Sequence, residues 1–153
     1  EPDALSADFI QYITSKEGQT IVNEKGYIAE IENAPAYTAS NLTGKITLSG
    51  STSVEKVMEK LKEEYIKLNP NMQIEIIYSG SSAGIKDAKD GKVQIAMSSR
   101  ELKAEEKEIL KDTIFARDGI AVIVNKANSI TAMTSDTITK IFKGEVRNWD
   151  EVK

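Results

Sequence analysis

Hydrophobic residues change their spacing along the chain, and these changes predict its central elements. Ile46 and Leu48 alternate with polar neighbours, as in a short strand. Between residues 54 and 68 the apolar positions instead recur every three or four residues, as on one face of a helix, at Val54, Val57, Met58, Leu61, Tyr65 and Leu68. Asn69-Pro70-Asn71 stops that helix, and residues 72–78 predict a second strand. The order is therefore strand, turn, helix, strand.

The later segments continue this alternation of strands and helices. We expect a short helix at residues 85–89, a third strand at 93–97 and a charged, solvent-facing helix at 101–111. Residues 115–125 hold the longest apolar run, Ile120-Ala121-Val122-Ile123-Val124, which is typical of a strand buried on both faces. A helix with a Thr134-Ser135-Asp136 cap should follow and end at Lys143-Gly144. The pattern predicts an α/β fold with a three-layer, open and mainly parallel sheet flanked by helices.

The N-terminal part of the chain has a different character. Residues 4–24 form an amphipathic pattern with Ser6 as the expected N-cap, a break near residues 15–18 and Gly26 as the expected C-cap. Periodicity then disappears from residue 29 to residue 44, where Pro, Asn and Glu are frequent. We therefore expect a helical segment over residues 1–31 and a linker over residues 32–45.

Small hydroxyl residues and glycines follow each of the three predicted strands. The segments are Gly50-Ser51-Thr52-Ser53, Ser79-Gly80-Ser81-Ser82-Ala83-Gly84 and Met97-Ser98-Ser99-Arg100. The carboxyl ends of parallel strands share one sheet edge, where ligands bind, and a helix that begins there offers unpaired N–H groups to an anion. Two simpler explanations stay open: Thr52 or Ser53 can serve only as an N-cap, and Gly and Ser are common turn residues.

Composition removes several classes of function. The chain has 0 Cys and 0 His, which excludes thiol catalysis, Ser-His-Asp hydrolysis and zinc sites built on Cys. We expect no enzyme activity, no metal and no cofactor. The paired carboxylates Glu63-Glu64 and Glu105-Glu106 are interpreted as solvated helix faces. The net charge is -4, so a nucleic-acid partner is not expected, and an anion would have to be held by local donors.

Together with Ala116-Arg117-Asp118-Gly119, Phe142-Lys143-Gly144 and Asn148-Trp149, the three hydroxyl segments form an ordered set of motifs. This set resembles the phosphate-binding proteins of bacterial ABC uptake systems, a two-lobed family of solute-binding proteins. By this resemblance, residues 46–126 form the first ligand-binding lobe and residues 127–153 begin an incomplete second lobe. Residues 1–31 resemble the C-terminal closing helices of the same family.

Closing helices that precede the lobe can arise in two ways. The chain can be cut from a tandem of two binding units, or it can be a circular permutation of one unit. The Pro-, Asn- and Glu-bearing linker suits a junction between copies, so the tandem is the favoured interpretation.

The resemblance implies capture of inorganic phosphate or a similar oxyanion by a half site. The residues it assigns to the ligand are Ser51, Thr52, Ser53, Gly80, Ser81, Ser82, Ser99, Arg100 and Asp118. Some members carry Asp where this chain has Ser99; Asp118 could replace that acceptor or could form a turn. The family further implies a membrane permease as partner and an extracytoplasmic location, either lipid-anchored at the cell surface or periplasmic. The alternative is a regulatory or sensor module of the same fold that binds another oxyanion or small ligand.

Overall fold

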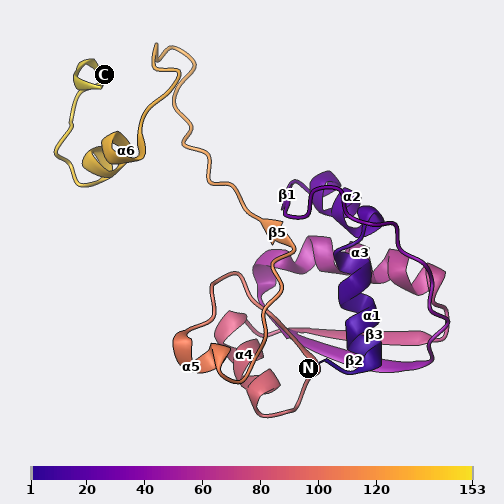
Figure 1. Cartoon of the computed structure of the whole chain (residues 1–153). Coiled ribbons are helices and arrows are strands. Elements are labelled where there is room, and N and C mark those ends of the chain that lie inside the picture. Colours follow the sequence, from indigo (N-terminus) through magenta and orange to yellow (C-terminus); the bar gives the residue numbers. More distant parts are fainter. Residues whose placement is uncertain (1, 153) are drawn as a thin grey trace. The chain divides into compact units, whose positions relative to one another are not determined.

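A three-stranded parallel sheet forms the centre of the first of two compact units (Figure 1). The computed structural model describes residues 2–152, which divide after Gly119 into two compact units. The first unit contains α1 (Ala4–Ile13), α2 (Lys16–Glu24), β1 (Ile28–Ala29), β2 (Gly44–Gly50), a 3-10 turn (Thr52–Val54), α3 (Glu55–Leu68), β3 (Met72–Tyr78), α4 (Ser81–Lys89), β4 (Ile95–Met97), α5 (Ala104–Lys107) and β5 (Ala116–Arg117). The second unit contains α6 (Ser135–Phe142) and a 3-10 turn (Trp149–Glu151).

The sheet has the order β3-β2-β4, and β2 runs parallel to both neighbours, with Leu48 opposite Ile76 and Ile95. Helices cover both faces. Leu48 is buried in one core with residues of α1 and α3, whereas Ser49 points to the other face and donates to Asp87 of α4 over 2.9 Å. These layers confirm the predicted α/β fold with an open, mainly parallel sheet.

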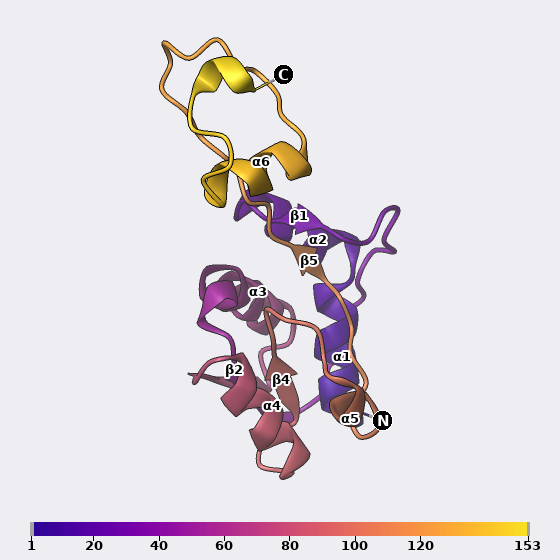
Figure 2. The same ribbon diagram turned by 90° about the vertical axis from the view of Figure 1, so that its left-hand side faces the viewer.

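The N-terminal helices belong to the core of this lobe. Phe9 of α1 is fully buried and packs edge-on against Tyr65 of α3, with ring centres 5.0 Å apart. The carboxylate of Asp8 accepts hydrogen bonds from the hydroxyl groups of Tyr65 (2.6 Å) and Tyr37 (2.7 Å). In α2, the Gln19 side chain donates to the Phe115 carbonyl over 3.0 Å. One apolar core thus joins both ends of the first unit, and the short pair of β1 with β5 lies beside it (Figure 2).

Residues 30–43 contain no helix or strand, yet they are fixed at several points. The Pro35 carbonyl accepts from Lys16 N (2.9 Å), and Tyr37 N donates to the Glu17 carboxylate (2.8 Å). Further on, Ser40 N donates to the buried Asn69 side chain (3.2 Å). The connection between α2 and β2 is therefore a strap held against the lobe.

The ends of the N-terminal helices differ in part from the prediction. The break near residues 15–18 is confirmed, since Ser15 caps α2 by accepting from Gly18 N. The N-cap of α1 was predicted wrongly, because Asp3 and not Ser6 caps it, accepting from Ser6 N over 2.8 Å. Ser6 is buried, and its hydroxyl has no partner among residues 2–152. An aspartate three residues earlier reaches the first turn with a charged acceptor and so displaces the serine.

Two predicted elements are wrong. The expected helix at residues 101–111 shrinks to α5, four residues long, because a segment with so few apolar residues has no continuous face to hold against a core. The apolar run Ile120–Val124 forms no strand, and Ile120 and Ile123 are 97% and 89% exposed. No strand of the described chain lies beside this run, so its composition alone does not make it a buried strand.

In the second unit the predicted helix is confirmed as α6, and Thr134 caps it by accepting from Thr137 N over 3.2 Å. No residue of α6 is buried. Among residues 2–152 we find no helix with the length and apolar character needed to cross a bilayer.

Candidate ligand-binding site

Backbone hydrogen bonds hold the three strand ends together. Ser51 N, after β2, donates to Met97 O at the end of β4 (2.9 Å), and Gly80 N, after β3, donates to Gly50 O (2.8 Å). The Ser81 hydroxyl accepts from Ser99 N over 3.1 Å and lies 3.2 Å from the Ser99 hydroxyl. We call residues 50–53, 80–82 and 98–99 the hydroxyl rim.

The first turn of the rim presents two hydroxyl groups that have no hydrogen-bond partner among residues 2–152. Ser51 is buried, and its oxygen accepts from Ser53 N over 3.2 Å, so Ser51 is the local cap. Thr52 and Ser53 are exposed, and neither hydroxyl is hydrogen-bonded within the part of the chain that the structure describes. The explanation of Thr52 or Ser53 as an N-cap is therefore wrong. The Ser53 carbonyl accepts from the Tyr27 hydroxyl, which ties this turn to the segment after α2.

The second segment places the start of α4 at the rim. This helix begins at Ser81, four residues earlier than predicted, so Ser81 and Ser82 lie in its first turn. Gly80 precedes it with a φ of 88° and provides no side-chain cap. Within residues 2–152 the N–H groups of Ser81, Ser82 and Ala83 have no acceptor. Together with the helix dipole they form a positive site that suits an anion.

A glycine allows α4 to lie this close to the sheet. A Cβ atom on Gly84 would come within 2.3 Å of Ser49 O and 2.4 Å of Gly50 Cα, so any side chain there would push the helix away from β2. Beneath the rim, the Ser49 hydroxyl lies 2.8 Å from the Ser79 hydroxyl and donates to Asp87. Sequence reasoning did not single out these two partly buried contacts.

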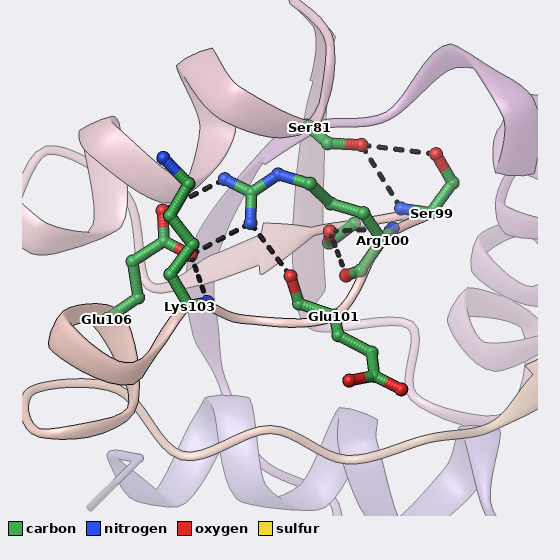
Figure 3. A network of polar contacts seen from close by, with 7 residues as sticks. Ser81, Ser99, Arg100, Glu101, Lys103 and Glu106 are labelled. Atoms are coloured by element: carbon green, nitrogen blue, oxygen red, sulfur yellow. Dashed lines mark hydrogen bonds and ion pairs between the residues drawn. The ribbon is translucent and has the colours of Figure 1, made fainter.

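Arg100 is placed at the rim but its charge is already paired (Figure 3). Its guanidinium donates to both carboxylate oxygens of Glu106, over 2.8 and 2.9 Å, and to the Glu101 carbonyl over 2.8 Å. Lys103 N also donates to Glu106 (2.8 Å). The Arg100 guanidinium, aided by Lys103 N–H, lowers the pKa of Glu106 from 4.5 to about 2.

The Glu105-Glu106 pair was interpreted as a solvated helix face, and this interpretation is wrong for Glu106. Its side chain is only 10% exposed because Arg100 and Lys103 enclose it. The sequence signal that could have indicated this role is the arginine six residues earlier, at the end of a predicted strand.

Within residues 2–152 the structure joins Asp118 to the rim by no hydrogen bond or ion pair. Asp118 is exposed directly after β5, which pairs with β1, and its carboxylate has no hydrogen bond within residues 2–152. Across the same residues no cluster of three or more Asp or Glu side chains could hold a metal ion.

A parallel sheet whose strand ends converge on unpaired N–H and hydroxyl donors is the architecture of one lobe of a solute-binding protein. Comparison with known proteins agrees. The PBP superfamily domain matches residues 35–153, and the chain belongs to this superfamily.

Within this superfamily, the similar proteins reported below are named for phosphate binding or phosphate transport. The phosphate-binding protein PstS 2 of Streptococcus agalactiae serotype V is 46% identical over 146 residues, which are 95% of this chain and 50% of the relative. The crystal structure of a phosphate-binding protein of a phosphate ABC transporter from Streptococcus pneumoniae matches with a TM-score of 0.87 and 41% identity, over 99% of this chain and 59% of that one. An ABC-type phosphate transport receptor from Vibrio cholerae matches with a TM-score of 0.59 and 36% identity, over 72% of this chain and 45% of that one.

The resemblance to phosphate-binding proteins that the motifs indicated is thereby confirmed. The chain spans about half the length of the curated relative it matches.

Proposed function

We propose that the hydroxyl rim is one half of a site that captures inorganic phosphate in the full-length protein. The observation that carries this proposal is the convergence of three strand ends on donors that have no partner within residues 2–152, namely the hydroxyl groups of Thr52 and Ser53 and the first N–H groups of α4. A hydrogen bond to a charged group contributes about 1.5–3 kcal/mol. Several such bonds from this rim, completed by an opposing lobe, suffice for tight binding even after the cost of association.

The rim is suited to hold phosphate by hydrogen bonds from neutral groups. It does not offer the anion an unpaired arginine charge. Arg100 is neutralised by Glu106, so the donors that remain are neutral. The oxygens of Ser81 and Ser99 lie 3.2 Å apart and can each accept as well as donate. They can therefore accept a hydrogen bond from the hydroxyl group of a monohydrogen phosphate, the role that some members of the family give to an aspartate at the position of Ser99.

In the same proposal the full-length protein captures phosphate without chemical turnover and delivers it to the membrane permease of an ABC transporter. It would then work outside the cytoplasmic membrane, lipid-anchored at the cell surface or in the periplasm. The names of the similar proteins, which describe components of phosphate ABC transporters, support this extension.

Titration calorimetry of the full-length protein with phosphate and with sulfate tests the site. We expect heat with phosphate, and Thr52→Ala and Ser81→Ala should each weaken binding about 10- to 100-fold, the equivalent of one hydrogen bond to a charged group. Thr20→Ala on α2, which also removes an exposed hydroxyl, is the matched control and should bind as the wild type does. Heat with sulfate alone would favour a sensor for another oxyanion. Unchanged affinity in both rim variants would show that the site lies elsewhere.

A further inference from the structure

The order of the segments in this chain has a physical explanation in the core of the first unit. If α1 and α2 closed the preceding copy of a tandem, they would have no reason to be buried in this lobe. Instead Phe9 and Tyr12 of α1 are almost fully buried against α3 and β2. The Gln19 side chain of α2 donates to the Phe115 carbonyl over 3.0 Å. The N-terminal helices therefore complete the lobe that follows them.

The comparisons with known proteins differ in whether they include the N-terminal helices. The matches to the streptococcal proteins cover nearly the whole chain, so they must include the N-terminal helices and the lobe in this order. The superfamily match, by contrast, begins only at residue 35, after both helices. The streptococcal relatives thus share with this chain the order in which the two helices precede the lobe. The S. agalactiae relative is about twice as long as the matched segment.

Large apolar side chains of the second unit are left exposed. Ile120, Ile123 and Phe142 are 97%, 89% and 82% exposed, and Trp149 is half exposed. A unit of this size usually needs further polypeptide to form a core, and large apolar side chains left exposed in one unit indicate that other polypeptide covers them. We call Ile120, Ile123, Phe142 and Trp149 the uncovered patch.

We propose that the uncovered patch is the docking surface for a segment of the full-length protein that precedes residue 1, so that the chain carries a circularly permuted two-lobed fold. In the family order, closing helices come after the second lobe. Since α1 and α2 resemble such helices and pack into the core of the first unit from its N-terminal side, this proposal places the rest of the second lobe before them in the sequence. The second lobe is then built from two segments of the sequence. One precedes the first lobe, and the other is residues 120–152, which follow it. This replaces the tandem interpretation.

Site-specific photo-crosslinking in the full-length protein tests this order. A benzophenone amino acid replaces Phe142 in one protein and Ile123 in a second, and after irradiation the crosslinked peptides are identified by mass spectrometry. We expect intramolecular crosslinks to peptides that precede residue 1. Ile109 of the first unit is also well exposed and is the matched control position, which should give no crosslink to those peptides.

Other outcomes would overturn the proposal. Crosslinks to peptides after residue 153, or crosslinks that join two copies into a dimer on a denaturing gel, would assign the uncovered patch to a different occupant. Crosslinks only to residues 2–119 would mean that the first unit itself covers the patch. The measurement does not depend on phosphate, so its result is separate from that of the calorimetric test.

Discussion

At the scale of single residues, Glu106 gives the best example of a role that composition hides. It lies in a run of charged residues, yet its carboxylate receives three hydrogen bonds, two from Arg100 and one from Lys103 N. A carboxylate that accepts from a guanidinium and a backbone N–H is stabilised in its charged form. Glu106 therefore fixes the loop that carries Ser99.

Because the pKa of Glu106 falls from 4.5 to about 2 on folding, this carboxylate contributes stability above about pH 4.5. That contribution is lost as the pH falls toward 2. We expect Glu106→Gln to be less stable than the wild type at pH 6 and to lose less stability between pH 5 and pH 3. Urea unfolding at several pH values measures both.

Glu105→Gln is the matched control for this pH dependence, because Glu105 is exposed and its carboxylate has no hydrogen bond within residues 2–152. This variant should retain the wild-type profile. An identical pH slope for Glu106→Gln and the wild type would contradict the role of the ion pair.

At the scale of elements, periodicity predicted those segments whose partners lie within the chain. The strand at Met72–Tyr78 was predicted with its exact bounds, and the helix from residue 54 is α3. Each of these two elements buries one face against other elements of the first unit, so its hydrophobic pattern matches the contacts that it makes. The run Ile120–Val124 has the composition of a buried strand but no neighbouring strand in the described chain, and apolar residues alone do not supply one.

The candidate site was predictable in outline for a related reason. Hydroxyl residues at three strand ends could be placed at one sheet edge from the fold class alone. The exact bonds could not, because they depend on details that spacing does not show. The close approach of α4 to β2 depends on Gly84, and the pairing of Arg100 depends on the way the chain turns back to Glu106.

The packing of α1 leads to a stability prediction at this scale. Phe9→Ala should destabilise the protein by about 3–5 kcal/mol, the usual cost of removing a buried aromatic ring, although the superfamily match does not include this helix. Urea unfolding followed by circular dichroism measures the change. Gln11→Ala, at an exposed position of the same helix, should stay within about 0.5 kcal/mol of the wild type. Equal stability of the two variants would show that α1 is not part of the core.

At the scale of the whole molecule, the two units differ in how much they bury. The first unit has a continuous core that includes residues from α1 to β4, whereas α6 buries none of its residues. An eight-residue helix with no packed face is marginal in water. The stability of the chain is therefore concentrated before residue 120.

Hydrogen exchange of the 153-residue chain should reveal this difference. Amides of β2 and α3 should exchange only through global unfolding, while amides of α6 should exchange at nearly the rate of an unfolded peptide. In the full-length protein the protection of α6 should rise, because the uncovered patch is then covered. Equal protection of α6 and β2 in the 153-residue chain would contradict this distribution of stability.

The strap at residues 30–43 has a consequence for the integrity of the lobe. The helices on its N-terminal side are held by Phe9, Tyr12 and the carboxylate of Asp8, not by the peptide bonds that lead to β2. A protease that nicks the strap once would thus yield two bands after boiling in detergent. The same sample would elute from a sizing column at the position of the intact protein, since the two pieces stay assembled.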